Sequence, residues 1–407
     1  MMRIVKIREG TSYRLEEKYI KSAKAYLENN SDLPVRISEG TISFQPYIVG
    51  SFMIDDLVIL IEPRIAGMTT NHYFEMQLFT EGLLREHLHT VATENMEFGI
   101  QDNLTDLFLT ELTKLIAIGV EGDFIPLEET TDRIKGRIQT DKITPENLLL
   151  DMIPVTYDVH TRATSYNKII KLALERLRVV LSSFEQKRKF SLAEKYFEEI
   201  EASENDLFSL QHDLSSKFYY ENEMYPAVLG LAKKILLQLK VNMRGNDVKC
   251  SSFLVNSNVI FEEYVRAILS SELEVSVCKW DRPREIGQFE VGNQRYYKSV
   301  IPDVLIGYDL SSDSALAVID VKNKDISDLQ NLGQLSDLYQ ILFYYSDLSA
   351  TYGALIYPSQ NNLEPVQFFI KSFQESVIYA FGVDFSQPIF QRHAKFCDDV
   401  KRVFHLK

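Results

Sequence analysis

The chain has 407 residues, 45% of them hydrophobic and 25% charged, and its formal net charge is −14 at pH 7. This composition is that of an ordinary globular protein, and the length predicts two or three domains. The acidic charge argues against indiscriminate binding to nucleic acid, because phosphate contacts need clustered Lys and Arg. If DNA is the substrate, a local basic surface or a partner has to supply those contacts.

Several classes of segment and site are absent from the sequence. It has no apolar run of membrane-spanning length, and its first residues are too charged for a secretory signal, so we expect a cytoplasmic protein without membrane contact. Cys250, Cys278 and Cys397 lack C-x-x-C spacing, which argues against a disulfide framework or a structural zinc site. No G-x-x-x-x-G-K-[ST] motif occurs, so we do not expect nucleotide hydrolysis by this chain.

The first hundred residues are predicted to begin with a charged helix over 13–27 and then to become rich in β-structure. Strands are predicted over 35–44 and 52–61, and Glu62-Pro-Arg-Ile65 follows the second of them. These strands have the pattern of core elements. They do not by themselves identify a functional site.

The middle of the chain is predicted to be mainly helical. Apolar residues between 104 and 116 recur every three or four positions, which indicates a helix with one buried face. Short β-prone pieces over 123–126 and 133–138 flank a polar turn, and the basic residues of Lys135-Gly-Arg137 would serve a partner or DNA, or belong to a solvated hairpin. Helices are expected again over 167–184 and 226–239. The cluster Arg244-Gly-Asn-Asp247 then predicts a domain boundary.

The polar residues with the clearest chemical pattern lie in one predicted hairpin. Two β-prone runs, 304–308 and 315–321, are separated by a turn-forming segment. Asp303 stands just before the first run, and Asp320 and Lys322 stand at the end of the second. Residues two apart in a strand point to the same face, so Asp320 and Lys322 are expected to project together. The sequence therefore predicts that two carboxylates and one ammonium group converge.

Such a group suits a hard divalent cation beside a phosphate. Lys322 would orient or deprotonate a water molecule, or stabilise the charge that grows on phosphorus during in-line attack. Gln340 and Tyr344 lie four residues apart on a predicted helix, so both can reach the same site. Lys324 is expected to leave the site for solvent, because Asn323-Lys-Asp325 has the composition of a strand end.

With Pro302-Asp303 as one half and Asp320-Val321-Lys322 as the other, this segment resembles the PD-(D/E)xK nuclease superfamily. Gln340-x-x-x-Tyr344 is similar to the element that follows in its RecB-like and McrC-like branches. The resemblance implies that Asp303, Asp320 and the carbonyl group of Val321 hold Mg²⁺, with Mn²⁺ as the alternative. It also implies a further acid from an earlier helix.

That further acid is indicated by Phe261-Glu262-Glu263, which is similar to a helix of McrC-like proteins and assigns the role to Glu262. The residues alone leave open whether Glu262 or Glu263 faces inward. Weaker similarity to McrC-like proteins covers most of the chain, including the strand pair that ends in Ile61-Glu-Pro-Arg-Ile65 and the x-G-R-I element at 135–138.

The resemblance implies an α/β protein with two parts. An α+β part over 1–244 would dock on a motor and contact DNA, and a PD-(D/E)xK domain over 245–407 would have a mixed sheet flanked by helices. The implied function is that of the endonuclease subunit of a McrBC-type restriction system, cutting double-stranded DNA. It would act with, and stimulate, a McrB-like AAA+ GTPase that recognises and translocates DNA, with methylated DNA the expected substrate. A stand-alone repair nuclease and a non-catalytic adaptor of an AAA+ motor are the alternatives.

Overall fold

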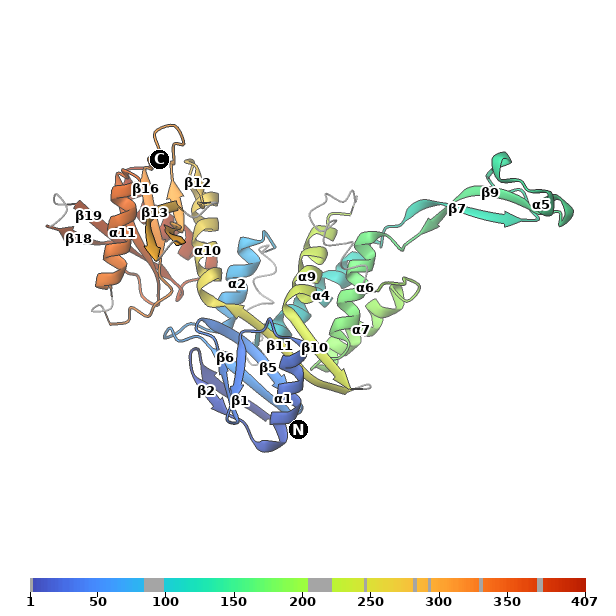
Figure 1. Cartoon of the computed structure of the whole chain (residues 1–407), viewed down its shortest axis with the longest axis horizontal. Helices are drawn as coiled ribbons and strands as arrows, with labels where there is room; N and C mark the ends of the chain where they lie inside the picture. Colours follow the sequence, from blue (N-terminus) through green and yellow to red (C-terminus); the bar gives the residue numbers. More distant parts are fainter. Residues whose placement is uncertain are drawn as a thin grey trace. The chain divides into compact units, whose positions relative to one another are not determined.

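The computed structural model of the chain describes residues 3–83, 99–203, 222–244, 247–280, 284–291, 294–328, 332–371 and 376–407. The chain divides into two compact units, the first made of Met1–Ile100 with Lys249–Lys407 and the second of Gln101–Val248. The boundary expected near Arg244 lies close to the end of the second unit, and the first unit takes in residues from both sides of it. Helices combine with sheets in each unit (Figure 1), which confirms the α/β fold class.

The N-terminal part of the first unit is built on small sheets. One contains, in this order, β1 (Arg3–Arg8), β6 (Leu57–Glu62), β5 (Ile48–Ile54) and β11 (Asp247–Asn256), and another contains β2 (Ser12–Arg14), β4 (Thr41–Phe44) and β3 (Val35–Ser38). β1 is parallel to β6, whereas β5 is antiparallel to β6 and to β11. Helix α1 (Glu17–Asn29) buries Tyr19, Ala23 and Tyr26 in one hydrophobic cluster with these strands. Their spacing of four and three residues places them on one helix face.

Two runs that we predicted as single strands are hairpins instead. The run 35–44 is interrupted at Glu39 and Gly40, and the run 52–61 is interrupted at Asp55. All three residues have positive φ angles, of 50°, 77° and 52° respectively. Left-handed backbone of this kind is typical of tight hairpin turns, so the chain reverses there and each run forms two shorter antiparallel strands.

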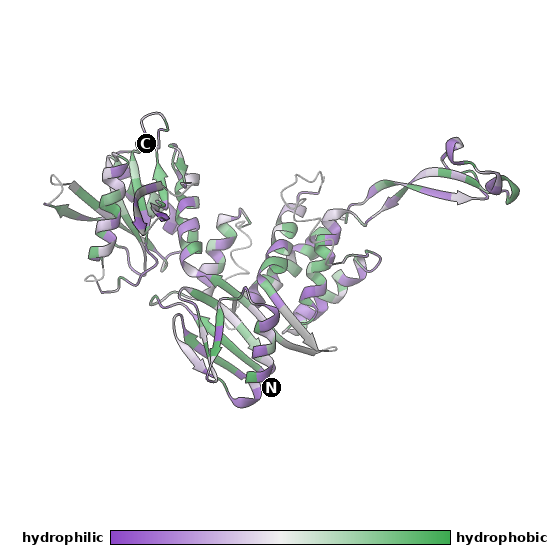
Figure 2. Ribbon diagram, viewed as in Figure 1, coloured by the Kyte–Doolittle hydropathy of each residue, from purple (hydrophilic) through white to green (hydrophobic). Residues whose placement is uncertain are grey.

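The C-terminal part of the first unit holds a mixed sheet. Its strand order is β12 (Val277–Cys278), β15 (Val304–Ile306), β16 (Ala317–Val321), β17 (Tyr352–Ser359), β19 (Ser376–Asp384) and β18 (Val366–Ile370). β16, β17 and β19 are parallel, and β15 and β18 are antiparallel to their neighbours. A separate ribbon pairs β13 (Arg284–Val291) with β14 (Gln294–Val300). The central strands are strongly apolar (Figure 2), as expected for strands covered on both faces.

Helices cover this mixed sheet, as the sequence predicted. They are α10 (Ser257–Glu272), α11 (Leu335–Asp347) and α12 (Ile389–Phe404), and α2 (Thr70–Thr80) packs against α10. Helix α11 packs through Ile341, Leu342 and Tyr344 into a cluster that includes Val318 of β16 and Leu355 of β17. Asp320 lies two residues after Val318 on β16, and residues two apart in a strand point to the same face. The Asp320 side chain is therefore on the α11 face of the sheet.

The second unit is made of helices and one long β-ribbon. The helices are α4 (Gly99–Ile118), α5 (Pro145–Leu149), α6 (Ser165–Leu177), α7 (Phe184–Tyr196) and α9 (Tyr225–Gln238), with a 3₁₀ turn at Thr140–Lys142 and strand β10 (Leu239–Arg244). The predicted apolar face of the first helix is confirmed, because Leu104, Leu107, Phe108, Leu112, Leu115 and Ile116 are all buried. No helix among the described residues is both long and apolar enough for a membrane span.

The helix that we predicted over 167–184 ends early. α6 stops at Leu177, and α7 begins at Phe184 after a break. The side chain of Ser183 accepts a hydrogen bond from the backbone N–H of Gln186, and the Gln186 side chain accepts one from the N–H of Ser183. This S-x-x-Q capping box starts a new helix, so the continuous prediction was wrong.

The β-ribbon pairs β7 (Asp123–Thr131) with β9 (Ile153–Thr161), and β8 (Arg137–Ile138) joins the other edge of β9. It extends away from the helices of the same unit and carries α5 at its far end (Figure 1). The predicted β-prone piece 123–126 therefore lies within β7, and the last two residues of 133–138 form β8. Both strands pair with β9 rather than with each other.

Candidate active site

The predicted hairpin is present and positions the first acid. β15 and β16 are antiparallel, with Val304 opposite Ile319. Asp303 directly precedes β15, and its Oδ2 accepts a hydrogen bond from the backbone N–H of Val321 at 2.8 Å. This bond holds the Asp303 carboxylate at the end of β16. On the other side, Nη1 of Arg266 from α10 donates to the carbonyl oxygen of Asp303 at 3.3 Å.

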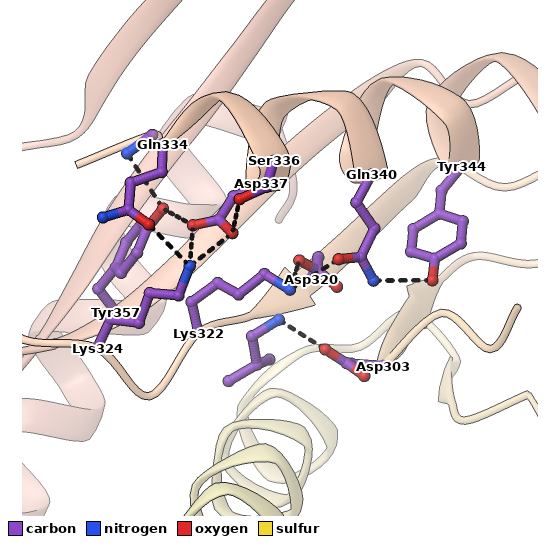
Figure 3. A network of polar contacts seen from close by, with 12 residues as sticks. Asp303, Asp320, Lys322, Lys324, Gln334, Ser336, Asp337, Gln340, Tyr344 and Tyr357 are labelled. Carbon is purple, nitrogen blue, oxygen red and sulfur yellow. Dashed lines mark hydrogen bonds and ion pairs between the residues drawn. The ribbon is translucent and has the colours of Figure 1, made fainter. Parts of the chain in front are cut away.

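The second acid and the lysine share a face, as the strand alternation predicted. Asp320 is 1% exposed, and its Oδ2 lies 2.6 Å from Nζ of Lys322. Lys322 also donates to Oε1 of Gln340 at 2.9 Å, and Nε2 of Gln340 donates to the hydroxyl of Tyr344 at 3.0 Å. Figure 3 shows these side chains converging from β16 and α11. Helix α11 thus holds the Lys322 ammonium group over the Asp320 carboxylate.

The charge of Glu262 acts on the same group of side chains. Burial raises the pKa of Glu262, the charges of Lys279 and Arg266 oppose that rise, and the charge of Asp320 adds to it. The Glu262 carboxylate also raises the pKa of Asp303. Of the two adjacent acids that the sequence left open, Glu262 is the one whose charge acts on the paired aspartates.

The two aspartates make this a site of concentrated negative charge. Burial raises the pKa of Asp303, with the Glu262 charge adding to it and the Val321 N–H opposing it. Burial likewise raises the pKa of Asp320, with the Asp303 charge adding to it and Lys322 opposing it. Buried carboxylates that repel one another favour a proton or a cation between them. Burial lowers the pKa of Lys322, but Asp320, Asp337 and Asp303 together outweigh that effect, so its pKa is raised and the group is an ammonium ion.

Lys324 is only partly exposed to solvent, because it pairs with an acid of α11, which we did not expect. Its Nζ contacts both carboxylate oxygens of Asp337, at 2.7 and 2.9 Å, and Oε1 of Gln334 at 3.3 Å (Figure 3). The Asp337 side chain is 4% exposed and that of Lys324 is 32% exposed. The backbone N–H of Lys324 donates to the carbonyl oxygen of Lys322 at 2.8 Å, which turns the chain tightly and brings Lys324 to the first turn of α11.

Some of the polar residues around the site were missed in the sequence. Arg266 lies four residues after Glu262 on α10, and this spacing could have placed it on the same helix face. Asp337 stands in the first turn of α11, where an acid complements the helix dipole, but nothing local pairs it with Lys324. Asn323 was recognised in the sequence only as part of a strand end, and nothing there indicated that its side chain is buried.

The oxygen donors agree with the expected cation. Within the described ranges, no three His, Cys, Asp or Glu side chains gather as a metal-binding group. Asp303 and Asp320 nevertheless interact closely enough for each to raise or lower the other's pKa, and Oδ2 of Asp320 lies 2.6 Å from Nζ of Lys322. Mg²⁺ is commonly held by one or two carboxylates together with waters and substrate phosphates. Two aspartates and the Val321 carbonyl fit that pattern.

Comparisons with known proteins found one matching family model and several matching structures. A family model described as McrBC 5-methylcytosine restriction system component matches residues 45–358, a range that contains every expected site residue. A chain from an assembly of Thermococcus gammatolerans McrB AAA+ hexamers with bound McrC matches with a TM-score of 0.70 and 15% identity, covering 98% of this chain and 100% of that one. This match shows a shared fold.

A chain of the Thermococcus gammatolerans McrBC complex also matches, with a TM-score of 0.49 and 14% identity over 66% of this chain and 87% of that one. A search of curated proteins found no match.

Proposed function

Because the chain belongs to the McrBC 5-methylcytosine restriction system component family, as its McrC-like motifs led us to expect, we propose that it is the DNA-cutting subunit of such a system. The observation that carries this proposal is the convergence of Asp303, Asp320 and Lys322 at one end of β16. The reaction would be hydrolysis of a phosphodiester bond in double-stranded DNA. Methylated DNA is the proposed substrate.

Each side chain of the site has a distinct role in this proposal. When bound, Mg²⁺ would be held by Asp303, Asp320 and the Val321 carbonyl and would supply Lewis acidity toward the phosphate. The Lys322 ammonium group, already oriented by Gln340, stabilises the negative charge that grows on the phosphate during attack. Tyr344 fixes Gln340 through the hydrogen bond to its hydroxyl.

Glu262 would complete the site from α10. Burial raises the pKa of its carboxyl group above the ordinary value, which makes the carboxylate a stronger proton acceptor. In this proposal the Glu262 carboxylate, whose charge acts on both aspartates, orients the attacking water. Glu262 thus takes the part of the earlier acid that the McrC-like motif implied.

We also propose that the chain works with an AAA+ partner, as McrC does in the assembly of McrB AAA+ hexamers. The β7–β9 ribbon supports a protein partner, because its far end exposes Leu148, Leu149 and Leu150 at 65%, 84% and 72%. Consecutive exposed leucines at the end of an extended ribbon are typical of a docking surface. The lack of a P-loop in this chain leaves nucleotide hydrolysis, proposed to be of GTP, to the partner.

The proposal is tested with Asp303→Asn and Asp320→Asn, using a McrB-like AAA+ partner from the same organism, GTP, Mg²⁺ and 5-methylcytosine DNA. Both variants should lose cleavage, while still binding the partner and raising its GTP turnover. Near wild-type cleavage by both would overturn the site assignment. Cleavage by the wild-type chain alone would favour a stand-alone nuclease. Stimulated GTP turnover without cleavage of any DNA would favour an adaptor.

A further inference from the structure

A buried polar cluster adjoins the proposed active site and has no role in the function described so far. Its centre is Asn323, which follows Lys322 directly and is 4% exposed. Oδ1 of Asn323 accepts a hydrogen bond from the Tyr73 hydroxyl at 3.1 Å, and its Nδ2 donates to Oγ of Ser257 at 3.0 Å. The carbonyl oxygen of Asn323 accepts a hydrogen bond from Nη2 of Arg64 at 2.6 Å. Asn323 is therefore tied at three points to residues far away in the sequence.

Arg64 is itself held firmly by the N-terminal strands. Its backbone N–H donates to Oε2 of Glu9 at 3.2 Å, and its guanidinium carbon lies 4.5 Å from the centre of the Tyr47 ring. Glu9 is buried, and its Oε1 accepts a hydrogen bond from Oγ of Ser257 at 3.0 Å. Glu9 follows β1 and Arg64 follows β6, and these parallel strands end at the same register, Arg8 opposite Glu62. Both residues are thus delivered to one place by the sheet.

We propose that Arg64 is a positioning residue, which clamps the backbone at Asn323 and so fixes the direction of the Lys322 side chain. We call the bonds of Arg64, Tyr73 and Ser257 to Asn323 the Asn323 clasp. This inference rests on the proposed function for the role of Lys322, but the clasp itself does not depend on any activity. It also gives a reason for the Glu62-Pro-Arg-Ile65 motif, to which the sequence alone assigned no site.

The backbone around Lys322 shows why the clasp is needed. On its N-terminal side the chain is fixed by the sheet, since the N–H of Lys322 donates to the carbonyl oxygen of Ile356 of β17 at 2.8 Å. Beyond Lys322 the strand has ended and the chain turns within two residues. Asn323 therefore lies beyond the last hydrogen bond of the sheet. The contacts of the Asn323 clasp hold it instead. A catalytic ammonium group misplaced by about 1 Å can lose on the order of a hundredfold in rate.

The substitutions are chosen to test the hydrogen bonds to Asn323 separately from the positive charge of Arg64. Arg64→Met keeps an unbranched apolar stem but removes the guanidinium group, which donates to Asn323 and lies over Tyr47, whereas Arg64→Lys keeps a cation that can donate one hydrogen bond. Tyr73→Phe removes only the hydroxyl on the opposite side of Asn323. The matched control is Arg36→Met, which removes the same charge from an exposed position on β3 of the same unit.

The first measurement is hydrogen–deuterium exchange of the full chain, without metal, DNA or partner, followed on peptides covering residues 320–327. Arg64→Met and Tyr73→Phe should exchange several times faster there than the wild type, Arg64→Lys should lie between, and Arg36→Met should not differ. Thermal unfolding shows whether each variant is folded. Unchanged exchange in folded Arg64→Met and Tyr73→Phe would overturn the clasp, whatever the cleavage data show.

The second measurement is steady-state cleavage with the AAA+ partner and Mg²⁺. Arg64→Met should lower kcat about tenfold, which corresponds to ~1.4 kcal/mol, and leave KM for DNA within about twofold, because ground-state binding does not use Lys322. Arg64→Lys should restore most of kcat. Faster exchange together with wild-type kcat would overturn the positioning role. A wild-type chain that cuts no DNA would instead refute the proposed function, and the exchange result would still decide the clasp.

Discussion

Replacing the two neighbouring lysines separately should damage two different properties of the protein. Lys322→Ala removes the ammonium group that lies 2.6 Å from Asp320 and is oriented by Gln340. Loss of one charged contact to the transition state typically costs about 3 kcal/mol, which is roughly a hundredfold or more in rate. Single-turnover cleavage at saturating partner and Mg²⁺ should therefore fall by at least that factor.

Lys324→Ala should act on stability instead. It leaves the Asp337 carboxylate buried without its cation, since the Asp337 side chain is 4% exposed. Breaking a fully buried ion pair costs about 3–5 kcal/mol, and the partial exposure of Lys324 should bring the loss to about 1–2 kcal/mol. Urea unfolding of the full chain measures this loss. The cleavage rate of folded Lys324→Ala should stay within about tenfold of the wild type.

The two variants serve as controls for each other, because each removes one lysine from the same three-residue stretch. Cleavage is compared only under conditions where circular dichroism shows both variants to be folded. Equal losses of single-turnover rate, or a larger loss in Lys324→Ala, would mean that Lys322 is not the lysine at the transition state. Equal stability losses would refute the assignment of Lys324 as a structural partner of Asp337.

Three further outcomes are expected. Leu149 lies at the far end of the β-ribbon and is 84% exposed. Leu149→Asp should lower the stimulation of the partner's GTP turnover at least tenfold without changing the melting temperature. Unchanged stimulation would mean that another surface docks on the partner. Burial raises the pKa of Asp102 to about 6, so the folded chain binds more protons than the unfolded chain, and stability falls as pH rises from about 4 to 6. Asp102→Asn should raise the melting temperature at pH 7.5 but not at pH 4, and no difference at pH 7.5 would contradict this. The fragment 245–407 should not fold alone, because it lacks Glu75, the partner of buried Arg392 at 2.7 Å; cooperative unfolding of that fragment would refute this dependence.

The chemical core of the site could be predicted because its geometry is local. Asp320 and Lys322 share a face through strand alternation, and Asp303 is brought to them by a hairpin of neighbouring strands. Gln340 and Tyr344 meet through helical spacing. Each of these relations needs only the type of secondary structure to be right, not the tertiary packing.

The contacts that hold this core could not be predicted in the same way. Arg64 and Asn323 are 259 residues apart, and Tyr73 and Asn323 are 250 apart. No periodicity joins such pairs, since they meet only where the ends of β1 and β6 abut the turn after β16. Two other wrong predictions concerned local features that the sequence does indicate. The Ser183–Gln186 capping box and the turn at Asp55 have recognisable sequence patterns. We predicted one continuous helix and one continuous strand because the apolar residues recur on both sides of these positions.

The three residues after β16 show how the first unit serves the site. Lys322 is fixed by Asp320 and Gln340, Asn323 by Arg64, Tyr73 and Ser257, and Lys324 by Asp337. Successive residues thus contact α11, then the N-terminal strands with α2 and α10, and then α11 again. A strand end would ordinarily be free to move, yet here each residue has its own buried or half-buried partner. In our proposal the position of the Lys322 ammonium group therefore depends on segments from both ends of the chain, which strand pairing and helix packing join in the first unit.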